Sequence, residues 1–166
     1  MGFFDDTLRD NETMFREEIA LDLDFMPHKV LYRENEHQHI ANCIKPLLKK
    51  RSGKNLLITG NPGIGKTVAT KKILEELEKD GLDEQTFPLY VNCWKKDSAH
   101  KIILDICNQI GYKFTLNKTT EQLMRETANI INKKSAVLVL DEIDKLSSDA
   151  FSAIYFITED IYRKTI

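Results

Sequence analysis

The chain has 166 residues, of which 42% are apolar and 30% charged, as expected for one globular domain with a core rather than two large domains. Its formal net charge of −2 gives no overall attraction to nucleic acid. The apolar runs are too short to span a membrane, and the N-terminus lacks the apolar core of a secretory signal, so the sequence argues against a membrane or secreted protein.

The first part of the chain changes character twice. Residues 1–24 are rich in Asp and Glu and predict an acidic N-terminal arm, loosely structured or helical. The stretch from Arg33 to Lys50 has a helical pattern, in which Pro46 predicts a kink or break. A basic cluster lies across the end of this pattern, just before the apolar run at 55–59, and fits a solvated helix end at least as well as a DNA contact. Its members are Lys45, Lys49, Lys50, Arg51 and Lys54.

The next segment carries the most specific motif of the chain. An apolar run at 55–59 predicts a strand buried on both faces, and a helical stripe at 66–80 ends before Gly81. Between them lies G-x-x-x-x-G-K-[ST], the phosphate-binding loop, whose glycines let backbone N–H groups approach an anion. The residues assigned to nucleotide binding here are Asn61, Pro62, Gly63, Ile64, Gly65, Lys66, Thr67 and Val68.

Strands and helices then alternate. We predict a strand at 89–93 introduced by Pro88, a helix from Asp97 or Ser98 to about Ile110, a helix with a Thr119–Gln122 capping box to Asn132, and a strand at 136–140. A last helix begins after Ser147 or Ser148. The alternation predicts parallel βαβ units and an α/β fold, a three-layer αβα sandwich.

An acidic pair ends the strand at 136–140. In a chain with a phosphate loop, Asp141 is expected to hold magnesium, largely through water, together with the hydroxyl of Thr67. Glu142 is the candidate general base, and Lys66 would contact the β- and γ-phosphates. Without the loop, a solvated Asp-Glu turn would explain the pair equally well.

Other reactive side chains give little signal. Cys43, Cys93 and Cys107 are odd in number and widely spaced, which indicates reduced intracellular thiols rather than a zinc or redox site. His37 and His39 lack a third metal ligand nearby in the sequence.

The chain resembles the archaeal replication initiators, AAA+ proteins related to the eukaryotic origin-recognition subunit one and cell-division-control protein six. Aspartate-glutamate-isoleucine-aspartate at 141–144 is the most specific likeness, because the phosphate loop alone would not separate this family from other ATPases. The remaining likeness lies in Met14-Phe15-Arg16, Asp24-Phe25-Met26-Pro27, Leu31-Tyr32-Arg33-Glu34 and Tyr90-Val91-Asn92-Cys93.

The resemblance implies three further sets of residues. Val30, Leu31 and Tyr32 would line the adenine pocket, although core packing explains them as well. Asn92 would restrain Glu142 until a ligand arrives, or else bond nearby backbone at the strand end. Contacts to DNA would come from Trp94, Lys95 and Lys96, for which a solvated loop is the simpler explanation.

The resemblance also implies that 25–166 is the N-terminal portion of an AAA+ domain, incomplete at its C-terminus. The chain stops where the fourth strand would begin, before the sensors, the arginine finger, the lid and the winged helix. In the family's strand order, 5-1-4-3-2, the strand at 55–59 would lie between two absent strands. Since an unpaired buried backbone group costs about 1–3 kcal/mol, we expect the isolated chain to be poorly stable.

The function implied is that of an ATP-binding module of a DNA replication initiator, using ATP or ADP with magnesium. Its full-length parent would hydrolyse ATP slowly to switch the binding of origin DNA and helicase loading. Expected partners are origin DNA, the replicative helicase or other initiator subunits, with no membrane, in a cytoplasmic, nucleoid-associated location. The alternatives are another AAA+ ATPase that remodels a protein partner, or a fragment with nucleotide binding only.

Overall fold

A computed structural model describes residues 34–152 and 154–155. Contacts divide the chain into Met1–Tyr32 and Arg33–Ile166, and every element below belongs to the second unit. The predicted acidic arm at 1–24 and the end of the last predicted helix lie outside the described residues. The labelled helices and strands, in chain order, are α1 (Glu34–Leu48), α2 (Lys66–Lys79), β1 (Thr86–Asn92), α3 (Ala99–Gln109), α4 (Thr120–Ile131) and β2 (Ser135–Asp141). A last helix begins at residue 148, and its described residues are 148–152 and 154–155.

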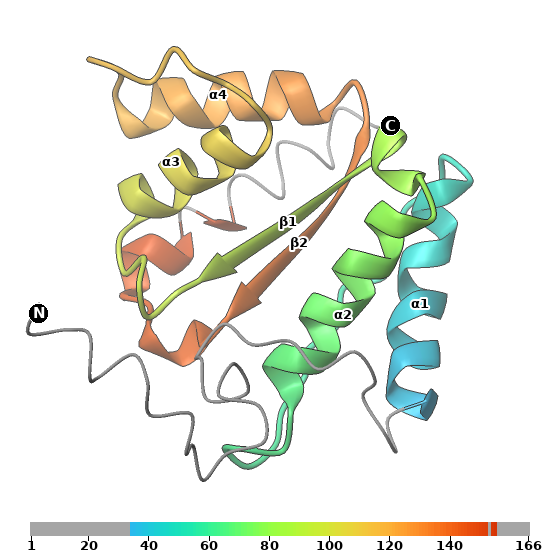
Figure 1. Cartoon of the computed structure of the whole chain (residues 1–166). Coiled ribbons are helices and arrows are strands. Elements are labelled where there is room, and N and C mark those ends of the chain that lie inside the picture. The colour runs from blue at the N-terminus through green and yellow to red at the C-terminus, as the bar shows by residue number, and fades with distance from the viewer. Residues whose placement is uncertain (1–33, 153, 156–166) are drawn as a thin grey trace, which may run out of the picture. The chain divides into compact units, whose positions relative to one another are not determined.

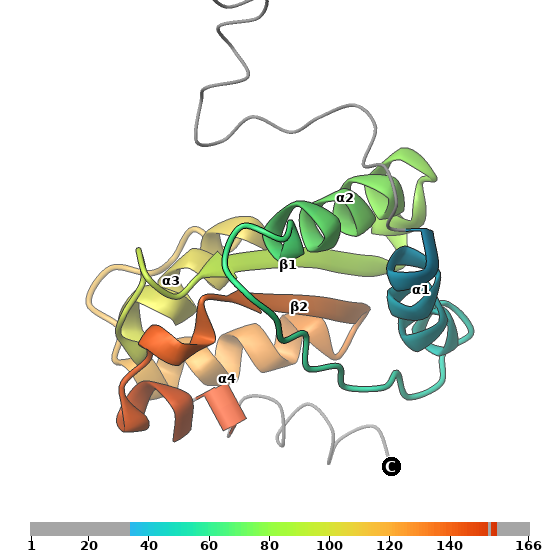
Figure 2. The same cartoon turned by 90° about the horizontal axis from the view of Figure 1, so that it is seen from below.

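The sheet of the described part consists of β1 and β2, which run parallel in a register from Thr86↔Ser135 to Asn92↔Asp141. Helices α1 and α2 cover one face of this pair, and α3 and α4 cover the other (Figures 1 and 2). The αβα layering predicted from the sequence is therefore confirmed, with a parallel sheet between two helical layers.

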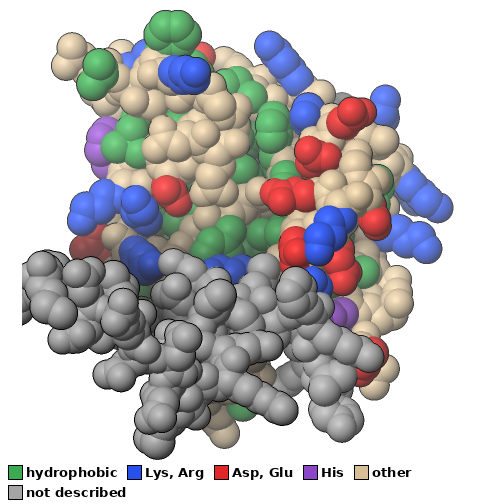
Figure 3. Space-filling model, viewed as in Figure 1, with side chains coloured by type: hydrophobic (Ala, Val, Ile, Leu, Met, Phe, Trp, Pro, Cys, Tyr) green, Lys and Arg blue, Asp and Glu red, His purple; other side chains and the backbone are tan. Residues whose placement is uncertain are grey.

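Each face of the sheet has its own apolar core, because side chains alternate along a strand. Leu89 and Val91 of β1 point to the α3 side, where Ile102 and Ile106 are fully buried against them. Tyr90, between them, points to the α2 side, where Ile73 and its neighbours on α2 pack on the strands. The outer surface of α2 is charged, as Figure 3 shows by the acidic side chains gathered over this helix.

Several predicted helix ends are confirmed. Ser98 caps α3 by accepting from the N–H of Lys101, and Thr119 forms the predicted capping box with Gln122. Gly81 takes a left-handed conformation just after α2, with φ 68. Ser147 caps the last helix, since its Oγ accepts from the N–H of Ala150 at 3.2 Å. These caps satisfy backbone groups that a helix end would otherwise leave without partners.

Proline alters the expected boundaries in two places. Helix α1 runs through Pro46 and ends two residues later at Leu48, so the predicted break falls at the helix terminus. There Lys50, at φ 54, closes a left-handed turn in which Arg51 N–H donates to Pro46 O at 3.0 Å. Strand β1 begins before the predicted start and includes Pro88, which pairs with Val137.

The predicted strand at 55–59 is wrong for this structure. Residues 53–60 adopt no regular structure, and Leu57 is 76% exposed. A strand needs a neighbour to accept and donate its backbone hydrogen bonds, and the only strand pair in the described part joins β1 to β2. None of the described helices is long and apolar enough to cross a membrane.

Candidate nucleotide-binding site

The phosphate loop turns sharply into α2. Gly63 and Gly65 have φ values of 79 and 88, a left-handed region that favours glycine. Gly65 is also the N-cap of α2, so no side chain caps the first N–H groups of this helix, and its first turn contains no acidic residue. Free N–H groups and the positive end of the helix dipole together suit a phosphate.

The side chain of Lys66 folds back onto the phosphate loop. Its ammonium donates to Gly60 O at 2.8 Å and to Asn61 O at 2.9 Å. These two bonds hold the charge beside the loop N–H groups, where the sequence motif predicts the β- and γ-phosphates.

The loop and the acidic pair meet, although they are far apart in the sequence. The Oγ1 of Thr67, in the first turn of α2, donates to Oδ2 of Asp141 at 2.8 Å. The other carboxylate oxygen accepts from the N–H of Glu142 at 3.1 Å. The structure therefore brings together the threonine and the aspartate that the sequence assigned to one cation.

This arrangement fits magnesium. A hydroxyl and a carboxylate are hard oxygen donors, and magnesium characteristically keeps several waters and takes further oxygens from substrate phosphates. Within the described ranges no group of three or more His, Cys, Asp or Glu residues could hold a metal ion. Thr67 and Asp141 would thus supply two of the oxygen ligands, and the phosphates of a nucleoside triphosphate would be needed for others.

Glu142 directly follows the strand and is exposed. Its backbone is left-handed, with φ 55 and ψ 41, which costs a non-glycine residue of the order of 1–3 kcal/mol. The next residues, Ile143–Lys145, form a short 3₁₀ turn. In this turn Asp144 pairs with Lys145 at 3.0 Å; this bond is the main cause of the lowered pKa of Asp144, to which Lys66 also contributes.

Sequence reasoning missed Tyr90. Its hydroxyl donates to the same Oδ2 of Asp141 at 2.7 Å. Burial, and then the Asp141 carboxylate, raise the pKa of this phenol far above its ordinary value, so it stays a donor. One signal was available: Tyr90 lies two residues before Asn92 on the same face of a strand whose end meets Asp141.

Asn92 lies opposite Asp141 in the strand register. Its side-chain oxygen accepts from the N–H groups of Trp94 at 3.0 Å and Lys95 at 3.1 Å, which corresponds to the backbone-bonding alternative. The turn leaves Trp94 70% exposed, while Lys96 pairs with Asp105 at 3.7 Å. The restraint of Glu142 by Asn92 stays a prediction. Val30, Leu31 and Tyr32, assigned to adenine, lie outside the described residues.

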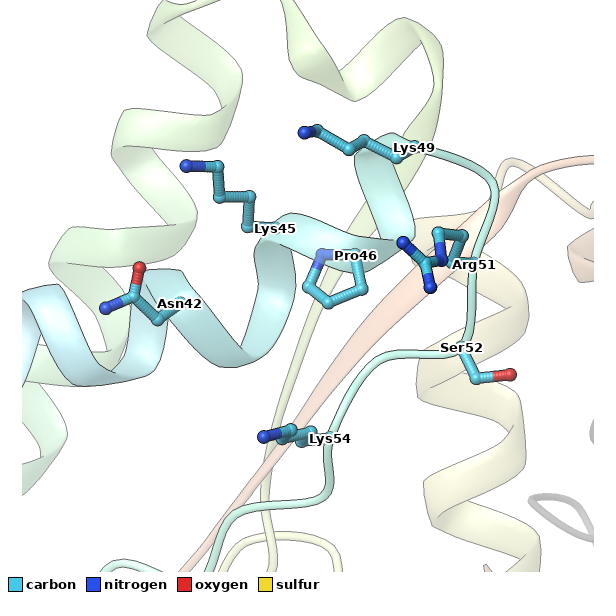
Figure 4. Close-up of a pocket in the computed structure, with 7 residues that line it drawn as sticks. All are labelled: Asn42, Lys45, Pro46, Lys49, Arg51, Ser52 and Lys54. Carbon is cyan, nitrogen blue, oxygen red and sulfur yellow. The ribbon is translucent and has the colours of Figure 1, made fainter.

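The basic cluster lies at the end of α1. A hollow of about 390 Å³ between this helix and the segment at 51–54 is lined partly by Lys45, Lys49, Arg51 and Lys54. Their charged ends point to separate places rather than toward one another (Figure 4). The geometry favours a solvated helix end, where cations complement the negative end of the helix dipole.

Burial raises the pKa of the thiols of Cys93 and Cys107. Burial, with a smaller effect from Asp141, raises the pKa of the Cys93 thiol to about 11. Cys43, Cys93 and Cys107 are all buried and form no disulfide.

The comparisons with known proteins agree with this geometry. A family model described as "AAA domain" matches residues 49–165. ORC1-type DNA replication protein 1 of Archaeoglobus fulgidus is 27% identical over 163 residues, covering 95% of this chain and 40% of the relative. ORC1-type DNA replication protein 2 of Methanothermobacter thermautotrophicus is 31% identical over 158 residues, covering 90% of this chain and 41% of the relative.

Solved structures share the fold. The structure of the Aeropyrum pernix ORC1 protein in complex with DNA superposes with a TM-score of 0.74 at 24% identity, covering 87% of this chain and 40% of that one. Cdc6p from Pyrobaculum aerophilum superposes with a TM-score of 0.71 at 20% identity, covering 88% of this chain and 40% of that one.

The chain thus spans about two fifths of the length of the curated relatives that it matches. Because the matched family model covers most of the sequence, including the phosphate loop and the acidic strand end, the chain belongs to the AAA domain family, and its homologues there are archaeal ORC1-type replication proteins.

Proposed function

We propose that the chain is the ATP-binding module of a DNA replication initiator, which hydrolyses ATP slowly to switch origin-DNA binding and helicase loading. The observation that carries the nucleotide part is the 2.8 Å hydrogen bond between Thr67 and Asp141, since it joins the phosphate loop to the acidic strand end. The replication part is supported by the ORC1-type relatives.

Each site residue then has a distinct task. The loop N–H groups and Lys66 bind the phosphates, and Thr67 and Asp141 hold magnesium, which neutralises phosphate charge. Glu142, exposed beside Asp141, orients and deprotonates the attacking water, with Asn92 as its proposed restraint. We further propose that Val30, Leu31 and Tyr32 contact the adenine.

Contact with DNA is proposed for the turn after β1. Trp94 is exposed there, and Lys95 follows it in a turn fixed by Asn92. Cations next to an exposed ring suit contact with a nucleic-acid backbone and its bases. The solved relative from Aeropyrum pernix is an ORC1 protein in complex with DNA. The replicative helicase or other initiator subunits are the proposed protein partners, in a cytoplasmic, nucleoid-associated setting.

Nucleotide binding is the first test. The protein is titrated with a fluorescent ATP analogue, once with magnesium and once with EDTA. We expect saturable binding that tightens with magnesium. If the protein bound no nucleotide in either condition, the proposal of an ATP-binding module would be wrong. If it bound equally well in both, Thr67 and Asp141 would not form a magnesium site for the nucleotide.

DNA binding separates an initiator from an ATPase that acts on a protein partner. Duplex DNA is titrated against the wild type, Lys95→Ala and, as a control, Lys133→Ala, which changes an exposed lysine at the opposite end of the sheet. We expect Lys95→Ala to weaken binding and to reduce the salt slope by about one, with no change for Lys133→Ala. If the wild type and both variants bound DNA equally well, this turn would not be a DNA contact.

A further inference from the structure

Resting on the proposed function, we infer that Tyr90 is a positioning residue for the carboxylate of Asp141 and sets how tightly the nucleotide site takes a divalent cation. Nothing in the phosphate-loop pattern requires a tyrosine at this point. The inference rests on where the phenol hydroxyl lies and on how firmly the surrounding structure holds it.

The Asp141 carboxylate is held by three elements at once. Its Oδ2 accepts from the Tyr90 hydroxyl of β1 at 2.7 Å and from the Thr67 hydroxyl of α2 at 2.8 Å. Its Oδ1 accepts from the N–H of Glu142 at 3.1 Å. The tyrosine is the one donor of the three that belongs neither to the phosphate loop helix nor to the acidic pair.

The position of Tyr90 is itself fixed from several sides. On one side β1 pairs with β2, which places Tyr90 beside Val139, two residues before Asp141. On the outer side the amide of Gln109 accepts from Tyr90 N–H at 2.9 Å and donates to Tyr90 O at 2.8 Å. The ring packs in the core beneath α2, with Lys71 Nζ 4.9 Å from its centre. Strand pairing, the bonds to Gln109 and the packing of the ring therefore fix the position of the Tyr90 hydroxyl.

The Tyr90 hydroxyl can change the affinity for the cation without being a ligand itself. The Thr67 hydroxyl can donate its hydrogen to Asp141 while its lone pairs face a cation. The Tyr90 bond keeps the carboxylate in the one orientation that faces Thr67, so less side-chain freedom is lost when the cation binds. Removal of a partner that orients a metal-binding carboxylate costs typically about 10- to 100-fold in metal affinity.

The test is Tyr90→Phe, which keeps the ring, its packing and the backbone bonds to Gln109. Binding of a fluorescent ATP analogue is measured in EDTA and across a magnesium titration, and bound Mn²⁺ is counted by electron paramagnetic resonance. We expect the magnesium concentration for half-saturation to rise by about tenfold, with nucleotide affinity in EDTA unchanged. The matched control is Tyr112→Phe, because that hydroxyl accepts from Lys118 in the loop between α3 and α4.

The outcomes are distinct. If the wild type binds nucleotide in a magnesium-dependent way and Tyr90→Phe has the same half-saturation as Tyr112→Phe, the inference is wrong while the proposed function stands. A lower melting temperature with an unchanged magnesium dependence would show that Tyr90 only stabilises the fold, which also overturns the inference. If the wild type binds no nucleotide at all, the proposed function fails first and the inference falls with it.

Discussion

Two short runs predicted to be strands end at the two halves of the candidate site, yet they have different structures. Residues 136–140 lie in β2, pair with β1 along its length and contact helices on both faces. Residues 55–59 are exposed and belong to no strand. Both runs look like buried strands in the sequence, so the difference shows that the pairing partner, rather than β propensity, decides whether such a run becomes a strand.

The site is assembled despite this difference. The phosphate loop is held from its C-terminal side, because α2 packs on the sheet through Ile73 and Leu77 against Val137 and Val139. The bond from Thr67 to Asp141 then ties the first turn of α2 to the end of β2. The position of the loop therefore depends on α2 rather than on the segment that precedes it.

The largest contrast is expected in amide hydrogen exchange. On average, amides of β1 and β2 should exchange on the order of 10³-fold or more slowly than those of 55–59, because the two strands pair in a packed sheet whereas 55–59 belongs to no strand. Exchange of peptic fragments followed by mass spectrometry measures both regions in one sample. Equal protection of 55–59 would mean that this segment pairs in solution and would remove the contrast.

Chemistry should depend on the paired strand. Glu142→Gln at the end of β2 is expected to slow ATP turnover by about 10²- to 10⁴-fold while nucleotide binding is retained, because the amide cannot accept the water's proton. Phosphate release and nucleotide titration are measured together. Glu121→Gln, an exposed change on α4, serves as the control, and unchanged turnover in Glu142→Gln would reject it as the base.

Stability should also depend on the paired strand. Leu89→Ala removes a side chain that is 1% exposed and should lower the free energy of unfolding by about 2–5 kcal/mol, through lost burial and a cavity. Urea denaturation measures it, with Leu116→Ala, at a residue 87% exposed, as the control. If both variants lost a similar amount of unfolding free energy, burial of Leu89 in the β1 core would not be what stabilises the fold.

Ligand binding should depend on the loop after the unpaired segment. Lys66→Ala is expected to weaken ATP binding by about 2–4 kcal/mol, since a charged phosphate contact is lost. The unfolding free energy should hardly change, because the hydrogen bonds of the ammonium go to carbonyls of its own loop. Calorimetry with ATP compares this variant with Lys133→Ala. Wild-type affinity in Lys66→Ala would exclude the lysine from the phosphate site.

The smallest effect is expected in the unpaired segment itself. Leu57→Lys should change the unfolding free energy by no more than about 0.5 kcal/mol, because the leucine side chain is already 76% exposed. The same substitution in a strand buried on both faces would cost several times more. If Leu57→Lys lowered the unfolding free energy by about 2 kcal/mol or more, the segment 55–59 would be buried in solution.

Much of the molecule was determined by the sequence alone, because the deciding signals are local. The capping serine before α3, the Thr119–Gln122 box and the left-handed Gly81 each satisfy backbone groups within a few residues, so the helices appear where they were predicted. The spacing of the phosphate loop likewise fixes which N–H groups and which lysine share one turn.

Tertiary structure decided what depends on neighbours distant in the sequence. It left 55–59 without a strand partner, let α1 continue through Pro46 to its end, and placed the Tyr90 hydroxyl on Asp141. The sequence predicted that Thr67 and Asp141 would hold one cation. These residues are 74 positions apart, and they come into contact only because α2 packs on the parallel strand pair. Backbone hydrogen bonds between strands and side-chain contacts across layers require both partners in space, and residue order does not supply the second partner.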